Sequence, residues 1–159
     1  IEACLVGSEM CIRDRVEDLP YKNKMLIKIK QAGLENRVFF LGKKPFEELP
    51  KLFRGMSVVA ALSRNEGYGL TPLEGMASGA AVLTSSAGVW DELVRDGIDG
   101  YVVDVDNVDQ TSEKLNLLIE NSSKTKIMGE NAAKYISENF SVENEAEKII
   151  KHVRDVQNI

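Results

Sequence analysis

Apolar residues along the chain follow two alternating patterns, short continuous runs and positions at helical spacing. Continuous apolar runs, typical of strands buried on both faces of a parallel sheet, occupy residues 37–42, 57–63, 80–86 and 100–104. Helical spacing predicts helices over residues 21–34, 45–56, from about 72, 89–97, 108–120, 124–138 and 142–156. Gly33 is expected to end the first helix and Ser141 to cap the last. This alternation predicts an α/β fold, a Rossmann-like doubly wound parallel sheet followed by C-terminal helices.

The composition is that of one folded domain. With 159 residues, 43% hydrophobic and 28% charged, the chain is long enough for a single core. The formal charge of −5 argues against a nucleic-acid-binding surface. The sequence contains no run of about 18 apolar residues, so it predicts no membrane-spanning helix. Peripheral contact with a membrane stays open. Cys4 and Cys11 indicate neither a zinc site nor a disulfide framework, and reduced thiols in the cytoplasm are expected.

The first fifteen residues, IEACLVGSEMCIRDR, differ in character from the rest of the chain. IEACLVGS has the pattern of a short buried strand, but the overlapping GSEMCIRDR resembles translated adapter sequence. Residues 1–15 are therefore expected to be a non-native or disordered leader, and residues 16–159 to form the domain.

A glycine-rich acidic loop, NEGYGLTPLEGMASG at residues 65–79, follows the second predicted strand. Ligands of doubly wound sheets bind beyond the carboxyl ends of the strands, which makes this loop the candidate site. Helix capping explains part of it, because Thr71 and Glu74 have the spacing of a capping box and Pro72 suits the first helical position. Capping does not explain Glu66 or the glycines that follow it.

A bound ligand explains the whole loop. Gly67 and Gly69 let the backbone approach a ligand closely, and the amides at a helix start attract an anion such as a diphosphate. Glu66 and Glu74 would accept hydrogen bonds from ligand hydroxyls on either side of that diphosphate. Sugars and riboses present such hydroxyls beside phosphate, so a sugar nucleotide fits both requirements. The loop matches neither a P-loop nor the Gly-x-Gly-x-x-Gly dinucleotide fingerprint.

Glu66 and Glu74 form a Glu-x7-Glu motif within EGYGLTPLEGMASGAAVLTSSAGVWDELVRDGIDGYVV. With this context, with RVFFLG before it and ENFSVENEAEKI after it, the chain resembles retaining glycosyltransferases of family four. The resemblance covers about residues 20–157 and implies the C-terminal, donor-binding half of a GT-B fold. Within the family the chain looks closest to bacterial enzymes that add sugars, often mannose, to the lipopolysaccharide core.

The resemblance implies roles for individual residues. Glu66 would act in catalysis by contacting hydroxyls of the donor sugar near the reacting carbon, and Glu74 would bind the ribose. Amides of the turn would face the diphosphate, and Lys44 would border the nucleobase. Tyr68 replaces the more usual phenylalanine and is expected to pack. The donor-binding residues expected on this basis are Lys44, Glu66, Gly67, Tyr68, Gly69, Leu70, Thr71 and Glu74.

The resemblance also implies a reaction and its partners. A hexosyl group, mannosyl by the subgroup, would pass with retained configuration from GDP-mannose or a UDP-sugar to a glycan or lipid-linked acceptor. The transition state would be oxocarbenium-like, and the leaving diphosphate would help to deprotonate the acceptor. Neither a metal ion nor a cofactor is expected. The reaction would take place in the cytoplasm, at the inner face of the cytoplasmic membrane.

One departure from the family bears on activity. The arginine and lysine that neutralise the donor phosphates, and the N-terminal acceptor domain, lie upstream of the matching region. The full-length parent is therefore expected to be an enzyme, and this chain alone to be inactive. Two alternatives stay open: a donor-binding fragment without activity, and a GT-B sugar-nucleotide epimerase.

Other candidate residues are expected to be structural. His152, the single histidine, falls on the last predicted helix, where a solvated position is expected. Trp90 is expected to pack the helix after the third strand, with a place at the rim of the site as its alternative. Asp104, Asp106 and Asp109 are spaced loosely like a calcium loop, but its glycine and closing glutamate are missing.

Overall fold

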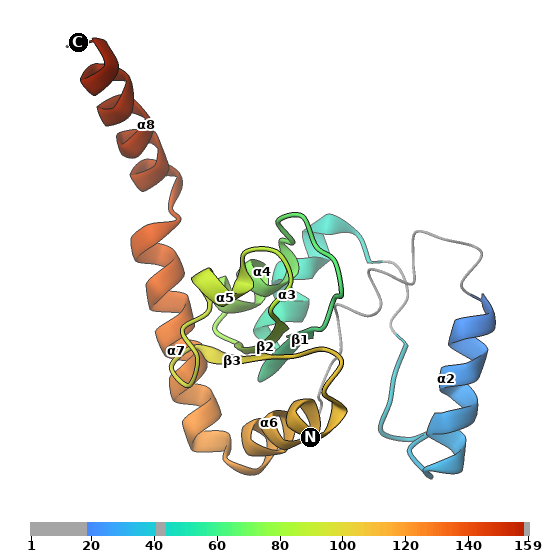
Figure 1. Ribbon diagram of the computed structural model, residues 1–159. Coiled ribbons are helices and arrows are strands. Elements are labelled where there is room, and N and C mark those ends of the chain that lie inside the picture. The colour runs from blue at the N-terminus through green and yellow to red at the C-terminus, as the bar shows by residue number, and fades with distance from the viewer. Residues whose placement is uncertain (1–18, 41–43, 158–159) are drawn as a thin grey trace.

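The computed structural model describes residues 19–40 and 44–157, and a parallel sheet of three strands lies at its centre (Figure 1). In order across the sheet, the strands are β1 (Val58–Ala61), β2 (Ala81–Ser85) and β3 (Gly100–Val103). Ala60 pairs with Leu83, which pairs in turn with Tyr101. Because the strands run parallel, their carboxyl ends meet at one edge of the sheet.

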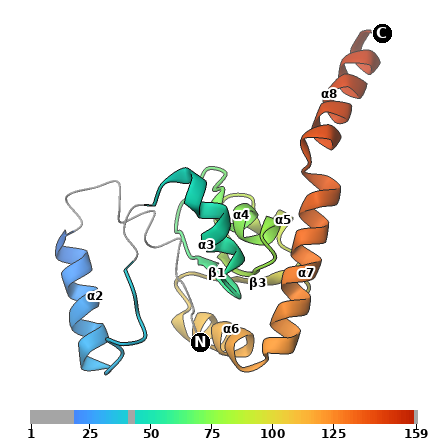
Figure 2. The ribbon, with the colours of Figure 1, turned by 180° about the vertical axis from the view of Figure 1, so that it is seen from behind.

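Helices cover both faces of this sheet (Figures 1 and 2). The helical elements are α2 (Leu19–Gln31), the 3-10 turn η2 (Phe46–Glu48), α3 (Leu49–Arg54), α4 (Thr71–Ala77), α5 (Trp90–Leu93), α6 (Val108–Glu120), α7 (Ser122–Asn139) and α8 (Val142–Gln157). α3, α4 and α5 pack on one face, α6 packs on the other, and α7 contributes to both. The predicted α/β fold with a parallel sheet and C-terminal helices is confirmed.

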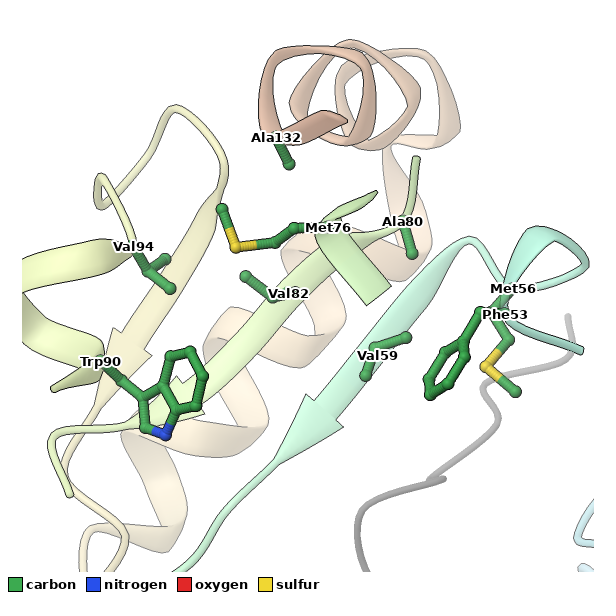
Figure 3. Packing of buried hydrophobic residues seen from close by; sticks show 9 residues of the cluster. All are labelled: Phe53, Met56, Val59, Met76, Ala80, Val82, Trp90, Val94 and Ala132. Carbon is green, nitrogen blue, oxygen red and sulfur yellow. The ribbon is translucent and has the colours of Figure 1, made fainter. Parts of the chain in front are cut away.

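Side chains that alternate along the strands form two apolar clusters. Val59 and Val82 face α3, α4 and α5 (Figure 3), whereas Ala60 and Leu83 face α6. The buried members of the first cluster are Phe53, Met56, Val59, Met76, Ala80, Val82, Trp90, Val94 and Ala132. Full burial of a Val, Leu or Phe side chain contributes about 1.5–3 kcal/mol, so the two clusters hold α3, α4, α5, α6 and α7 against the sheet.

The strand predicted at residues 37–42 is wrong for the part that the structure describes. None of its described residues lies in a strand, and its last two residues lie outside the described part. The amides of Arg37 and Val38 donate to the carbonyl of Leu34 at 2.9 and 3.2 Å, which withdraws them from any sheet ladder. Phe39 is 64% exposed, so the apolar run that predicted a strand is not buried in a sheet.

Two predicted helix boundaries are confirmed, the end of α2 and the start of α8. Gly33 follows α2 with a φ of 66°, and this left-handed conformation ends the helix. The Ser141 hydroxyl accepts a hydrogen bond from the Asn144 amide at 3.1 Å and so caps α8. α8 extends away from the sheet (Figures 1 and 2), and its apolar residues Ile149 and Val153 are exposed.

The close approach of α7 to the sheet depends on Gly129. A Cβ added there would lie 2.0 Å from the carbonyl oxygen of Gly79, which precedes β2. The Gly79 carbonyl is part of the backbone, and the backbone of α7 fixes the direction of the Cβ, so neither can rotate aside as a flexible side chain would. The missing side chain at Gly129 therefore allows α7 to pack against the start of the central strand.

We expect Gly129→Ala to lower the free energy of unfolding by about 1–3 kcal/mol, because the added methyl group overpacks this contact. At an uncrowded helical position the same change would stabilise by roughly 1 kcal/mol. Urea denaturation followed by circular dichroism measures the difference. Gly67→Ala is the control, since no atom lies within 4 Å of a Cβ built there. A Gly129→Ala variant as stable as the parent chain would contradict the packing described.

Candidate functional site

The carboxyl edge of the sheet gathers three loops. They are residues 62–70 after β1, 86–89 after β2 and 104–107 after β3. Two contacts join these segments: the Ser85 hydroxyl donates to the Ser63 carbonyl at 2.5 Å, and Arg64 forms an exposed ion pair with Asp106. The segment that leads into the glycine loop is therefore tied to β2 and to the loop after β3.

The two glycines that follow Glu66 have different roles. Gly69 has a φ of 67°, and a Cβ there would lie 2.7 Å from Glu66 Cγ and 2.9 Å from Trp90 Cζ2. Glycine alone fits this turn without backbone strain and without a clash. Gly67 has no positive φ, and the space around its Cα is open, so neither conformation nor packing requires glycine there.

The Glu66 carboxylate is half-buried and makes one weak hydrogen bond. Its Oε2 accepts from the Ser63 hydroxyl at 3.5 Å, which is long for such a bond. Among the described residues, no lysine or arginine lies within ion-pair distance of Glu66. A carboxylate has about four acceptor sites, so most of its capacity is available to a ligand.

α4 begins one residue earlier than the capping box predicted. Thr71 is the first helical residue, and Leu70 occupies the cap position in a helical conformation, with φ −89° and ψ −23°. The Glu74 amide donates to the Leu70 carbonyl at 2.9 Å, an ordinary helical hydrogen bond. Because Leu70 already provides the first accepting carbonyl, the predicted cap at Thr71 is wrong by one residue, and Pro72 takes the second helical position.

Glu74 holds a buried polar atom that lacks a partner. Its Oε2 is buried and accepts no hydrogen bond from any residue that the structure describes. Burial raises the pKa of Glu74 above its ordinary value, because removal from water disfavours the charged carboxylate. A buried carboxylate oxygen without a donor destabilises the fold, so this atom is the strongest indication of a ligand at the edge.

Three other predicted residues make no side-chain hydrogen bond or ion pair within the part of the chain that the structure describes. Tyr68 is 49% exposed and Leu70 is 61% exposed, so both side chains lie on the surface of the loop. The packing role expected for Tyr68 is therefore wrong, since Tyr68 joins neither apolar cluster. Lys44 is half-buried and makes no hydrogen bond or ion pair with a described residue.

Sequence reasoning missed two contacts that the site contains. The Ser63 hydroxyl meets Glu66, and a Cβ on Gly88 would lie 3.0 Å from the Glu66 carbonyl oxygen. The loop after β2 therefore rests on the glycine loop. One signal was available, because consecutive strands are usually neighbours and bring their following loops together. Trp90 is 2% exposed, which confirms its packing role.

Two other kinds of site are absent from the part of the chain that the structure describes. Within residues 19–40 and 44–157, no group of three or more His, Cys, Asp or Glu side chains is arranged to hold a metal ion. No helix in the described part of the chain combines the length and apolar character needed to cross a membrane. His152 is exposed on α8, as the sequence predicted.

Known proteins related to this chain are longer than it is. The family model described as Glycosyl transferases group 1 matches residues 1–135. The lipopolysaccharide core biosynthesis mannosyltransferase LpcC of Rhizobium leguminosarum bv. viciae is 36% identical over 86% of this chain and 38% of its own length. LpsB of Rhizobium meliloti, also named a lipopolysaccharide core biosynthesis mannosyltransferase, is 29% identical over 82% of this chain and 37% of its own length. The chain therefore spans less than two fifths of these relatives.

Solved structures share the fold. The C-terminal domain of a group 1 family glycosyl transferase (LpcC) from Francisella tularensis has a TM-score of 0.75 at 32% identity, covering 80% of this chain and 66% of that one. HepE of Anabaena, in complex with UDP, has a TM-score of 0.78 at 28% identity, covering 89% of this chain and 38% of that one. These similarities extend over most of the chain and confirm the predicted fold class.

The burial of Glu74 predicts a specific pH dependence of stability. Its pKa is higher in the folded than in the unfolded chain, so Glu74 destabilises the fold as pH rises through that interval. Glu74→Gln carries no titrating group at this position. We therefore expect the stability of Glu74→Gln relative to the parent chain to increase as the pH rises above the unfolded-state pKa of glutamate, about 4.3. Urea denaturation at several pH values measures this difference in the free energy of unfolding.

Glu143→Gln is the matched control, because Glu143 lies exposed at the start of α8. Below the unfolded-state pKa, about 4.3, Glu74 is protonated in the folded and in the unfolded chain. The difference in the free energy of unfolding between Glu74→Gln and the parent chain should then no longer change with pH. A Glu74→Gln difference that stays constant across the whole range would show that burial does not disfavour the charged carboxylate.

Proposed function

The chain belongs to the Glycosyl transferases group 1 family, and from this premise we propose that it forms the donor-binding half of a retaining hexosyltransferase. The donor would be GDP-mannose or a UDP-sugar, bound where β1 and β2 end. Two relatives named as lipopolysaccharide core mannosyltransferases favour a mannosyl group and a glycan or lipid-linked acceptor. With such an acceptor, the full-length protein would work at the inner face of the cytoplasmic membrane.

The single observation that carries this proposal is the buried, unpartnered Oε2 of Glu74. A ribose presents two neighbouring hydroxyl donors, and a hydrogen bond from either would satisfy this oxygen and favour the charged carboxylate. The diphosphate would then lie beside the amides of Gly69, Leu70 and Thr71, at the turn into α4. HepE, a similar fold solved with UDP, supports a nucleotide ligand for this kind of domain.

Glu66 is proposed to contact the donor sugar. Its one weak hydrogen bond, from Ser63, leaves carboxylate oxygens that sugar hydroxyls can reach. Its negative charge beside the reacting carbon would also stabilise the positive charge that develops in an oxocarbenium-like transition state. Glu66 and Glu74 would thus hold the two ends of the donor, with the diphosphate between them.

The edge of the sheet supplies little positive charge for the phosphates. Arg64 is the only basic residue between Met56 and Val94, and it is paired with Asp106. A departing diphosphate needs stronger electrostatic stabilisation than this. We therefore assign further cations to a part of the parent protein outside this chain. On this proposal the chain alone binds donor without completing transfer, and in the whole protein the leaving diphosphate takes the acceptor proton without a metal ion.

Isothermal titration calorimetry with GDP, GDP-mannose, UDP and UDP-glucose tests the proposal. We expect the parent chain to bind one nucleotide family, and Glu74→Gln to weaken binding of its nucleoside diphosphate about tenfold. That loss corresponds to a charged hydrogen bond worth about 1.5 kcal/mol. Glu143→Gln, on α8, should bind like the parent chain.

We expect Glu66→Gln to lower the affinity for the sugar nucleotide about tenfold and to leave the affinity for the matching nucleoside diphosphate unchanged. The contrast follows because Glu66 would contact the sugar and Glu74 the ribose. If the parent chain keeps its native circular dichroism spectrum but binds none of the four ligands, the proposed function is wrong.

A further inference from the structure

Trp90 supports the turn that carries Glu66. A Cβ built on Gly69 would lie 2.9 Å from Trp90 Cζ2 and 2.7 Å from Glu66 Cγ. Gly69 is therefore enclosed between the indole ring and the aliphatic part of the glutamate. The φ of 67° at Gly69 gives this turn a shape that only glycine adopts readily. The position of the Glu66 side chain is thus coupled to the position of the Trp90 ring.

The segment that contains Trp90 also contacts the Glu66 backbone. Gly88, two residues before Trp90, has a φ of 68°, and a Cβ there would lie 3.0 Å from the Glu66 carbonyl oxygen and 3.2 Å from that of Gly67. The Glu66 backbone therefore lies against the segment after β2, and the Glu66 side chain and the Trp90 ring both adjoin Gly69. The only hydrogen bond to the Glu66 carboxylate within the described chain, from Ser63, is 3.5 Å long and too weak to fix it alone.

Trp90 is itself fixed by the core. It is 2% exposed and belongs to the cluster that includes Val82, Met76 and Val94 (Figure 3). A buried ring with close-packed neighbours has few rotamers available, so it provides a rigid support for the turn above it. The same cluster contains Phe53, which comes from α3 and lies at the opposite end of the group in Figure 3.

We propose that Trp90 is a positioning residue for the donor sugar: its ring holds the Gly69 turn so that the Glu66 carboxylate meets the sugar hydroxyls. This inference rests on the proposed function, which assigns Glu66 to the sugar. The Gly69 amide also faces the diphosphate on this proposal, so loss of Trp90 would affect both halves of the donor, but only the sugar half would also lose its contact with Glu66. The measurable quantity is the ratio of affinities for the sugar nucleotide and for the matching nucleoside diphosphate.

Trp90→Phe removes Cζ2 and leaves space beneath Gly69 while keeping an aromatic ring in the core. We expect the affinity ratio, measured by calorimetry, to fall about three- to tenfold, because the affinity for the sugar nucleotide falls more than the affinity for the nucleoside diphosphate. Phe53→Leu is the control, because it removes a buried ring from the same cluster at a site away from the turn. It should lower the thermal midpoint and leave the ratio as in the parent chain.

Trp90 is the only tryptophan, so its emission gives a second readout that needs no core substitution. We expect the sugar nucleotide to change Trp90 fluorescence more than the nucleoside diphosphate does, and Glu66→Gln to remove the additional change. An unchanged affinity ratio in folded Trp90→Phe overturns the inference. If that variant does not fold, equal emission changes with the two ligands overturn it. Absence of any nucleotide binding by the parent chain instead refutes the proposed function itself.

Discussion

The pairing of β2 with both neighbouring strands is the constraint on which the rest of the structure depends. All five residues of β2 are buried, and β1 and β3 run parallel to it on either side. Parallel pairing brings the loops that follow the three strands to one edge. The Ser85 hydroxyl, at the end of β2, donates to the Ser63 carbonyl and fixes the segment that leads into the glycine loop. The site is therefore a product of strand pairing before any ligand contributes.

This edge of the sheet contains polar atoms whose burial lowers the stability of the fold. Glu74 Oε2 is buried without a donor, although removal of a carboxylate from water is unfavourable unless hydrogen bonds replace the lost hydration. Thr84 Oγ1, near the end of β2, is also buried and unpaired within the described chain. The core around them is apolar and close-packed, which provides the stability that such groups remove. A ligand hydroxyl at Glu74 would convert an unfavourable burial into a binding interaction.

The sequence predicted features that depend on local pattern and missed those that depend on distant contacts. Buried strands such as β2 and the helices α6 to α8 follow from apolar periodicity and were confirmed. The strand at 37–42 failed because the Arg37 amide turns back to the carbonyl of Leu34, which apolar character does not reveal. The Glu-x7-Glu spacing marked the loop as a candidate site. The proximity of Trp90 to Gly69 joins residues 21 positions apart, and only the folded structure reveals it.

The central claim is that the Glu74 carboxylate receives a hydrogen bond from the ribose of a nucleotide. A carbon-13 NMR titration of the Glu74 carboxyl group, with and without saturating UDP or GDP, tests it most directly. Hydroxyl donors favour the charged form, so the account predicts that nucleotide binding lowers the pKa of Glu74 from the raised value that burial causes. A nucleotide that binds to saturation and leaves the titration of Glu74 unchanged would contradict the account.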